Sequence, residues 1–564
     1  MPEELRMKRK SLFFVTVALL FTVLFFYGCK KGAASTGYST ETVVTAAPGQ
    51  FPLTESRAEL TVLISKPPYV SDLNQNQAAA WYEELTNVHV KYIHVPYENS
   101  RASTNLLIAS GEYPDIIMNA GLSSVDAINY GGQGILIPIN DLIDKEGYFF
   151  KEAAGRIPEL TPAMQMPDGN IYGLPNINQA FHTFYNTKAW INEDWLKKLN
   201  LAVPATTEEF YEVLKAFKTR DPNGNGKADE IPMMGYYTTF FRSAPYVFLL
   251  NSFVYFNPGN YLAMENGKVT FVANTGDFRE GLRYVARLVD EGLIDKASFT
   301  QSADQAKQIG TNPNAPLIGV LSEQGWWPYV GMNNDTADHR AYNYTALSPL
   351  KGPKGVQLSP VQGTGFSLDF AQITDKARDP VLAFRWLEGL YSDEATRGIQ
   401  LGVKGTLWDD PDPGAQGINQ KPALYKVLTS PSDESPYWAP NIFLGNRSSD
   451  FRLGQQMDWS NPLAKYDQEP KLYRETLEKY YPYRPKEGQY LPLVLHHTAQ
   501  ENSDLARLSE QINTYTLENI MAFITGNKNL DRDWDSYTAE FRRLNLDRYL
   551  QFKQTAYDRQ YGKK

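Results

Sequence analysis

The sequence predicts an α/β fold, because short apolar strands alternate with helical segments along the first part of the chain. The apolar run at residues 60–64 indicates a buried strand, and helical spacing follows over 77–85. An alternating strand at 88–95 and a second buried strand at 116–117 continue the pattern. Strands separated by helices are typical of a mainly parallel sheet. Since ligands collect beyond the carboxyl ends of such strands, residues 119–123 are a candidate cleft loop.

The N-terminus has the layout of a secretory signal. Residues 8–10 are Lys-Arg-Lys, and residues 12–26 form an almost unbroken apolar run. Gly28 and Cys29 follow, and a cysteine at this place resembles a bacterial lipobox. The resemblance implies that a signal peptide of residues 1–28 is removed and that Cys29 receives an acyl chain such as palmitate. An uncleaved transmembrane anchor and an ordinary signal are the alternatives, and all three place the rest of the chain outside the cytoplasm.

Composition predicts an exported, folded protein behind a flexible tether. Residues 29–54 are assigned to the tether, because Ala, Ser, Thr and Gly dominate them and cannot bury enough surface to fold. Cys29 is the only cysteine among 564 residues, so the exported part has no disulfide bonds. Its length suggests two or more domains. The formal net charge of −9, without long basic runs, argues against nucleic acid as a partner.

A capped helix and an oxygen-rich loop form the strongest motif in the middle of the chain. Thr206 and Glu209 have the capping-box spacing that opens a helix. Apolar residues then recur along one helix face: Phe210, Val213, Leu214 and Phe217. The helix leads into residues 221–230, where oxygen-bearing side chains recur at the spacing with which calcium loops surround a hard cation. These side chains belong to Asp221, Asn223, Asn225 and Asp229.

The remaining residues of this loop bear on the choice between a calcium site and a simple turn. Gly226 permits the sharp turn, and Lys227 would contribute its backbone carbonyl. Pro232 stands where an EF-hand carries its bidentate glutamate, so Glu230 is the expected substitute. A turn built from Asn and Gly is the alternative. Acidic or amide side chains at alternating positions exceed what a turn requires, which favours structural calcium.

Several segments together resemble the lipoprotein solute-binding subunits of bacterial ABC importers, family 1, and in particular its LipO-type and alginate-oligosaccharide-binding branch. The segments that carry the resemblance span most of the chain: 111–116, 168–175, 185–196, 221–226, 386–394 and 534–537. Members of this family bind sugars or peptides without changing them. The resemblance therefore implies an α/β, two-lobed fold like that of type II periplasmic binding proteins, with the lobes joined by hinge crossovers.

The resemblance also implies a division of the chain and a set of partners. Hinge crossovers are expected near 174–178, 351–362 and 402–410. Lobe one is expected at 55–176 and 360–405, and lobe two at 177–359 and 406–564. The calcium ligands would be Asp221, Asn223, Asn225, Asp229, Glu230 and the carbonyl of Lys227. The expected partners of this monomer are an oligosaccharide, a permease with a paired ATPase, and the membrane, through the lipid anchor.

Loop aromatic residues and a few polar residues are candidates for the solute cleft. Sugar rings stack on aromatic plates, and their hydroxyl groups require polar partners. Two aromatic pairs lie between Gly or Pro residues and outside any helical or alternating pattern: Trp326 with Trp327, and Tyr437 with Trp438. The resemblance adds Tyr172 or Tyr185, and loop position adds Asn74, Asn76 and Arg447. Packing in the core is the alternative for the tryptophans, and is predicted for Trp190, Trp195, Trp386 and Trp534.

The sequence favours a binding protein for an oligosaccharide over an enzyme. It contains no His-Glu-x-x-His zinc motif, no Gly-x-Ser-x-Gly elbow and no phosphate-binding loop. A mature chain without further cysteine has no thiol nucleophile. A glycosidase needs only two suitably spaced carboxylates, so a secreted carbohydrate-active enzyme, glycosidase or lyase, is one alternative. A peptide-binding subunit and a surface adhesin or structural lipoprotein are the others.

Overall fold

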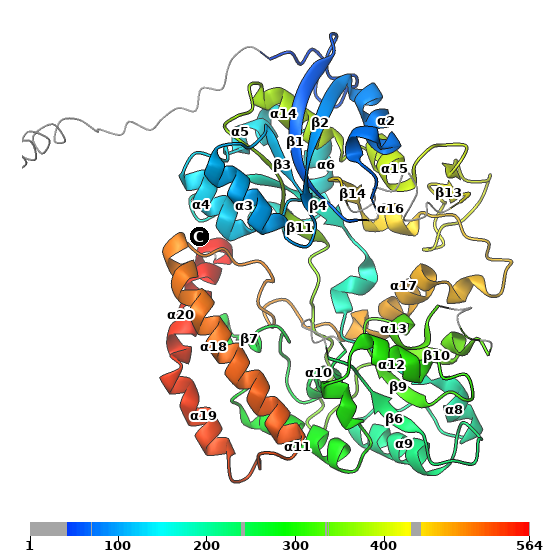
Figure 1. Ribbon diagram of the computed structural model, residues 1–564. Helices are drawn as coiled ribbons and strands as arrows, with labels where there is room; N and C mark the ends of the chain where they lie inside the picture. Colours follow the sequence, from blue (N-terminus) through cyan, green and yellow to red (C-terminus); the bar gives the residue numbers. More distant parts are fainter. Residues whose placement is uncertain are drawn as a thin grey trace, which may run out of the picture. The chain divides into compact units, whose positions relative to one another are not determined.

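The chain forms two α/β lobes, each built around its own sheet (Figure 1). The computed structural model describes residues 42–68, 70–237, 243–332, 336, 338–429 and 442–562. The signal segment, Cys29, Tyr437 and Trp438 lie outside the described residues. Of the helices that are described, none combines the length and the apolar character needed to cross a bilayer.

Lobe one contains a six-stranded mixed sheet. Its strands are β1 (Ala58–Lys66), β2 (Val88–Pro96), β3 (Ile116–Met118), β4 (Gly173–Asn178), β11 (Phe366–Ile373) and β14 (Asn446–Arg447). Their order in the sheet is β14-β4-β11-β3-β1-β2. β2 and β3 pair parallel with β1, and β14 pairs parallel with β4. Because β11 runs antiparallel to both β3 and β4, all strands except β11 point the same way. The predicted strands and their mainly parallel arrangement are confirmed.

Helices cover the sheet of lobe one. They are α2 (Gln77–Thr86), α3 (Ser100–Ser110), α4 (Ser124–Gly132), α5 (Asn140–Glu146), α6 (Phe149–Gly155), α7 (Leu160–Met164), α14 (Pro380–Gly389) and α15 (Asp393–Leu401), with the 3-10 turn η1 (Leu73–Gln75). Strand residues such as Val62 and Ile64 pack with helix residues such as Leu382 and Trp386 in one core. Burial of this apolar surface is the main force that holds the lobe together.

The folded chain begins earlier than its composition indicated. Leu53 belongs to the core of lobe one, and its N–H donates to the carbonyl of Thr86 over 3.0 Å. The rings of Phe51 and Phe149 stack with their centroids 5.7 Å apart. Residues 43–54 therefore pack on lobe one and are not flexible, because a few large side chains suffice where they fill gaps on an existing surface.

Lobe two contains a four-stranded sheet in the order β10-β5-β9-β6. Its strands are β5 (Ala189–Asn192), β6 (Ile231–Met234), β9 (Ile318–Ser322) and β10 (Tyr344–Leu347). β6 and β9 are parallel, whereas β5 is antiparallel to β9 and β10 is antiparallel to β5. A separate hairpin, β7 (Leu262–Glu265) with β8 (Lys268–Phe271), lies between the helices of this lobe.

Lobe two carries the predicted capped helix. Its helices are α8 (Glu193–Lys198), α9 (Thr207–Thr219), α10 (Pro245–Leu250), α11 (Gly276–Asp290), α12 (Ala303–Gly310) and α13 (Trp327–Val330), with the 3-10 turns η3 (Lys296–Phe299) and η4 (Arg340–Asn343). The capping box of Thr206 and Glu209 opens α9, and the four predicted apolar residues of its inner face are buried, as predicted. Trp190 and Trp195 are completely buried in the core of this lobe, and the same core contains Trp534.

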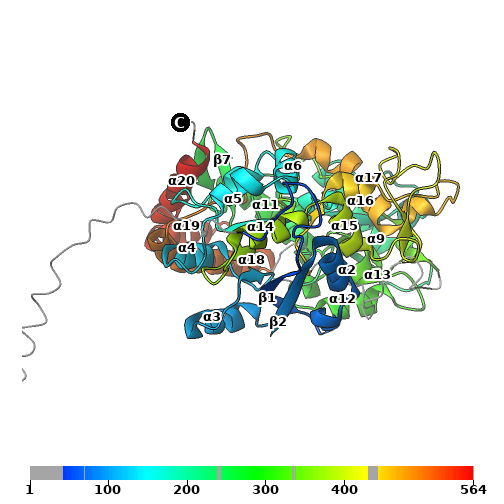
Figure 2. The ribbon, with the colours of Figure 1, turned by 90° about the horizontal axis from the view of Figure 1, so that it is seen from above.

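Long helices complete the C-terminal part. α18 (Ala499–Ile524), α19 (Trp534–Arg543) and α20 (Leu546–Tyr561) pack on the core of lobe two. α18 contacts α11 and α20, and it also contacts α4 of lobe one. Both views of the ribbon show α4 next to these C-terminal helices (Figures 1 and 2). The C-terminal helices therefore touch both lobes.

The chain passes between the lobes at three places before the C-terminal helices. β4 leads through the 3-10 turn η2 (Phe181–Tyr185) into β5, and residues 348–365 join β10 to β11. Residues 402–410, which the sequence indicated as the third crossover, instead enter an excursion with β12 (Trp408–Asp409) and β13 (Lys426–Val427). The chain then returns to lobe one as β14, although these residues were expected in lobe two. The third passage follows through α16 (Ser449–Leu453), the turn η5 (Ala464–Tyr466) and α17 (Gln468–Lys479).

Candidate functional site

The carboxyl ends of the parallel strands in both lobes face the first crossover. In lobe one, β4 and the strands parallel to it end at the edge where the chain leaves for η2. In lobe two, Ala189 at the start of β5 pairs with Ser322 at the end of β9, so β6 and β9 also end where the crossover arrives. In open α/β sheets this edge is where ligands bind. The two edges therefore define the candidate site.

The lobe-two edge presents an acidic residue and aromatic rings. Glu323, directly after β9, is buried, and it accepts a hydrogen bond from the Tyr236 hydroxyl at 2.6 Å and another from the Gln324 N–H at 2.7 Å. Trp327 follows, and its ring lies directly on Gly325, where a Cβ atom would come within 1.8 Å of a ring carbon. Only glycine allows the ring this position. The Trp327 ring is half-buried, whereas the Tyr236–Glu323 pair is buried behind it and supports this edge from within.

Polar side chains from three segments meet where the lobes join. Arg452 on α16 donates to Asn178 at the end of β4 over 3.1 Å, and its guanidinium binds both carboxylate oxygens of Glu469 on α17 at 3.2 and 2.8 Å. Burial, with Arg452 nearby, lowers the pKa of Arg447 to about 10. Burial also lowers the pKa of His182 to about 4, so its ring is neutral at pH 7. The hinge thus contains a cluster of polar side chains, formed by Arg447, His182 and the Arg452–Glu469 pair.

A buried lysine fixes the first crossover. The ammonium group of Lys188 donates to the carbonyls of His182, at 2.8 Å, and of Tyr185, which satisfies carbonyls at the end of η2. The same group lies 5.3 Å from the ring centroid of Tyr480. Burial lowers the pKa of Lys188 to about 7. The Lys188 side chain therefore ties the start of β5 to the backbone of η2.

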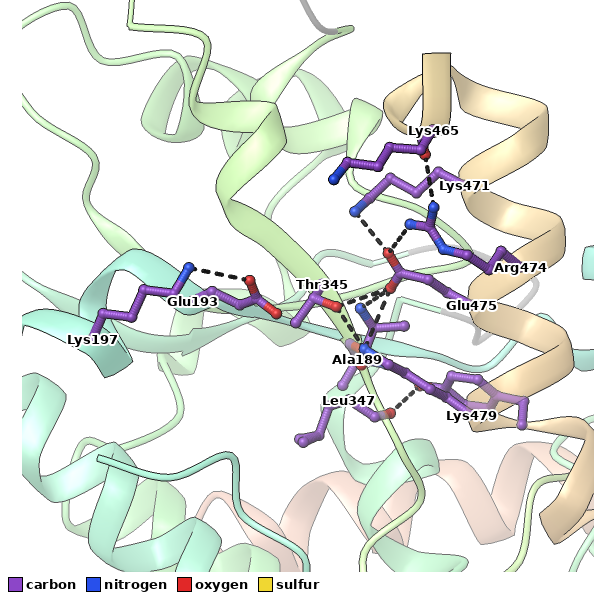
Figure 3. A network of polar contacts seen from close by, with 12 residues as sticks. Ala189, Glu193, Lys197, Thr345, Leu347, Lys465, Lys471, Arg474, Glu475 and Lys479 are labelled. Carbon is purple, nitrogen blue, oxygen red and sulfur yellow. Dashed lines mark hydrogen bonds and ion pairs between the residues drawn. The ribbon is translucent and has the colours of Figure 1, made fainter. Parts of the chain in front are cut away.

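α17 is anchored to the edge of the lobe-two sheet by a buried acidic residue (Figure 3). The Glu475 carboxylate accepts hydrogen bonds from the backbone N–H of Ala346 and, at 3.1 Å, from the Thr345 hydroxyl. Lys471 pairs with Glu475 at 2.7 Å, and both side chains are almost completely buried. The Lys471 ammonium also lies 5.4 Å from the ring centroid of Trp326. Because β10 is an edge strand, the carboxylate replaces the strand partner that Ala346 lacks.

Several residues that the sequence suggested for the solute site have structural roles instead. Trp326 is completely buried, with its ring centroid 5.0 Å from that of Trp190, so it belongs to the core. Asn76 caps α2 by accepting from backbone N–H groups, and Asn74 exchanges two hydrogen bonds with the backbone of Tyr92. Their polar groups are therefore used within lobe one and are not available to a solute.

The two suggested tyrosines are also largely buried. Tyr172 is 3% exposed, and its hydroxyl donates to Asp168 at 2.7 Å. Tyr185 is 5% exposed and lies in an aromatic cluster with Phe181 and Tyr481 of the hinge region. Of the residues that the sequence suggested for the solute site, the structure places Trp327 and Arg447 at the strand-end edges of the two lobes.

The sequence analysis missed exposed aromatic residues at strand ends. Tyr97 directly follows β2 and is 54% exposed, and Tyr237 follows β6 by three residues and is 57% exposed. Trp459, on the third passage between the lobes, is partly exposed, and its indole N–H donates to the carbonyl of Gly417 at 3.3 Å. An aromatic residue just beyond a predicted strand would have been the signal for the two tyrosines. Tyr97 and Tyr237 therefore join Trp327 as candidate contacts.

The predicted calcium loop is tightly wrapped around its first residue. The Asp221 carboxylate accepts backbone hydrogen bonds at 3.0–3.1 Å from Gly224, Asn225 and Gly226. Gly226 has a φ of 74°, which favours glycine. The Asn223 and Asn225 amide groups donate to Asp229, and the Asn225 oxygen accepts from the N–H of Lys227. Hydrogen bonds among these residues thus give the loop its shape without an ion.

The electrostatics of this loop fit a cation. Burial raises the pKa of Glu230, and the carboxylates of Asp221 and Asp229 raise it further. One Glu230 carboxylate oxygen is buried without a hydrogen-bond partner. Within the described residues, no three His, Cys, Asp or Glu side chains form a ready-made metal cage. The uncompensated negative charge and the orphaned oxygen are nevertheless what a hard cation would neutralise.

The fold and the strand-end site define a solute-binding protein. Residues 77–400 match the family of bacterial extracellular solute-binding proteins, and the chain belongs to this family. Solved two-lobed members of the class share the fold. The predicted two-lobed α/β fold and the predicted family are confirmed.

Particular relatives cover the chain over most of its length. The chain is 30% identical over 97% of its length to the fructooligosaccharide ABC transporter substrate-binding protein FusA of Streptococcus pneumoniae, of which it covers 97%. It is 27% identical over 61% of its length to lipoprotein LipO of Bacillus subtilis, of which it covers 66%. These relatives are substrate-binding proteins or lipoproteins.

Two solved structures extend the comparison. A structure of an EF-hand mutant of S. pneumoniae FusA in complex with fructo-nystose has a TM-score of 0.68 and 28% identity, and the match covers 89% of this chain and 99% of that one. Alginate-binding protein AlgQ2, solved without calcium ion, has a TM-score of 0.60 and 25% identity over 90% of this chain and 99% of its own.

Proposed function

We propose that this protein is the solute-binding component of an ABC importer and that it captures an oligosaccharide between its two lobes. The observation that carries the proposal is the match to FusA over 97% of both chains, since FusA is a fructooligosaccharide-binding protein. The strand-end site supports it, because the half-buried ring of Trp327 and the exposed ring of Tyr237 are aromatic faces on which a sugar could stack. The protein would bind its solute without changing it.

Capture would proceed by closure of the lobes around the hinge. Strand pairing and the two cores support a lobe one of residues 43–178, 366–401 and 442–453, and a lobe two of 185–347 and 468–562. Solute that contacts both edges favours the closed form only by binding it more tightly than the open form. A permease with its ATPase would then accept the closed protein. Tyr437 and Trp438 remain predicted contacts outside the described residues.

A binding screen tests the proposed function. Thermal shift is measured with neutral fructo-oligosaccharides, acidic alginate oligosaccharides and short peptides, because a ligand that binds only the folded state raises the melting temperature. One sugar class is expected to raise it while the sugar is recovered intact. Stabilisation by peptides alone would contradict the sugar proposal, and recovery of a shortened sugar would indicate an enzyme.

The lipid anchor is tested at Cys29. Cys29→Ser is expected to abolish labelling with a palmitate analogue and to release the protein from the membrane, because the acylated thiol is lost. Solute affinity should stay unchanged, since the candidate solute contacts lie far from Cys29 along the sequence. Lys30→Ala serves as the matched control and should remain anchored. An unmodified thiol in the mass spectrum of the mature wild-type protein would contradict the proposal.

Calcium is proposed as a structural ion at Asp221, Asn223, Asn225, Asp229 and Glu230, with the carbonyl of Lys227. The ion would neutralise the carboxylates that together raise the pKa of Glu230. Chelation is expected to lower stability, by about 2.7 kcal/mol where calcium had been at a hundredfold excess over its Kd. Asp221→Ala should cause the same loss and make the protein insensitive to chelator.

A control variant distinguishes loss of the calcium ion from a general effect of substituting an acidic residue in this region. Glu208→Ala, on the exposed face of the preceding helix, should retain the chelator response of the wild type. The measurement is the melting temperature of each variant in calcium and in chelator. An equal response of Asp221→Ala and wild type to chelator would show that the loop does not hold the ion.

A further inference from the structure

We propose that Asn178 and Gln179 form a pair of amide donors for hydroxyl oxygens of the solute, and that α16 positions them. The inference rests on the proposed function, because it assigns polar contacts to a sugar at the place where the lobes join. Asn178 is the last residue of β4, and Gln179 follows it into the first crossover.

All three passages between the lobes meet at these two residues. The backbone N–H of Asn178 donates to the carbonyl of Gly365, on the second passage, over 2.8 Å. The N–H of Gln179 donates to the carbonyl of Arg447, at the end of β14, over 2.9 Å. The pair therefore lies at the carboxyl ends of two parallel strands and at the hinge itself. From this position the two side chains could contact a solute held between the lobes.

The orientation of both amides follows from their partners on α16. Nη1 of Arg452 donates to the side-chain oxygen of Asn178 at 3.1 Å. The backbone N–H of Ser449 donates to the side-chain oxygen of Gln179, also at 3.1 Å. Because a guanidinium and a backbone N–H can only donate, the oxygen of each amide must face α16. The two NH₂ groups consequently point away from it.

These NH₂ groups are hydrogen-bond donors that the described part of the fold does not use. Neither amide nitrogen has a hydrogen-bond partner among the residues that the structure describes, and both side chains are half-buried. Half-buried donors without a partner are costly unless a ligand or water satisfies them. Such donors suit hydroxyl oxygens of a sugar, which accept hydrogen bonds.

Arg452 is held firmly enough to act as a positioning residue. Its Nε and Nη2 atoms bind the two oxygens of Glu469, while Nη1 reaches Asn178. A planar guanidinium can make these contacts at once, whereas a lysine ammonium provides one compact charge without the fork. Arg452→Lys should keep a positive charge near Glu469 and lose the contact that orients Asn178.

The donor pair is tested by calorimetric titration with kestose and with the other sugars of the screen. Asn178→Ala and Gln179→Ala are each expected to weaken binding about three- to tenfold, which corresponds to one lost hydrogen bond. The melting temperatures without solute should change little. Gln551→Ala is the matched control, because the oxygen of this amide is likewise held by an arginine, Arg548, at 2.9 Å but lies on α20. Its affinity should equal that of the wild type.

The positioning role is tested by a double-mutant cycle. Arg452→Lys should weaken binding by the same factor as Asn178→Ala, and the double variant should bind no more weakly than either single variant. Additive losses would show that Arg452 acts separately from Asn178. If wild type binds a sugar and both alanine variants bind it equally well, the donor pair is overturned. This outcome does not depend on whether Arg452→Lys folds. A wild-type protein that binds none of the sugars would overturn the proposed function, and this inference with it.

Discussion

Trp327→Ala is expected to weaken solute binding tenfold or more while leaving the melting temperature of the free protein nearly unchanged. The Trp327 ring is half-buried at the lobe-two edge, so its removal costs little in the absence of solute. Full burial of such a side chain against a sugar is worth roughly 1.5–3 kcal/mol, and about 1.4 kcal/mol corresponds to a factor of ten in affinity.

The neighbouring tryptophan provides the matched comparison. Trp326 is completely buried against Trp190, so Trp326→Ala should destabilise the protein by about 3–5 kcal/mol through the cavity it leaves. The apparent affinity of Trp326→Ala should fall only because a fraction of the protein is unfolded and cannot bind. Denaturant unfolding and titration of both variants give the two quantities. If Trp327→Ala loses stability and binds normally when folded, the solute does not stack on this ring.

Glu475→Ala is expected to destabilise the protein by about 3–5 kcal/mol, because it leaves Lys471 as an uncompensated buried charge. It also removes the acceptor for the N–H of Ala346 on the edge strand. Denaturant unfolding measures the loss. Glu478→Ala on the exposed face of the same helix should stay within about 0.5 kcal/mol of wild type. Equal unfolding midpoints of the two variants would show that this network does not anchor α17.

Local signals in the sequence predicted individual elements well. The capping box of Thr206 and Glu209 and the apolar face of α9 are properties of one segment, and both are found in the structure. β1 to β3 were visible for the same reason, since alternating or continuous apolar runs report burial of a strand. The family resemblance supplied the two-lobed arrangement, which no local pattern contains.

Long-range pairing is where sequence reasoning failed. β14 has two residues and belongs to lobe one only because it pairs with β4, far away in sequence. Trp326 looked like a loop residue between Gly325 and Pro328, yet it is the N-cap residue of α13 and packs on Trp190 of β5. Asn76 could have been recognised, because an asparagine before a helix is a typical N-cap.

The packing of residues 43–54 decides which lobe would be held near the membrane. Leu53 lies in the core of lobe one, so any pull on the N-terminal end of the chain would be transmitted to lobe one first. If Cys29 carries the lipid, the fourteen residue steps from Cys29 to Val43 can span at most about 50 Å. Lobe one would then be the stationary body, and solute-driven closure would swing lobe two relative to the importer. Movement of lobe two alone would then distinguish the loaded protein from the empty one.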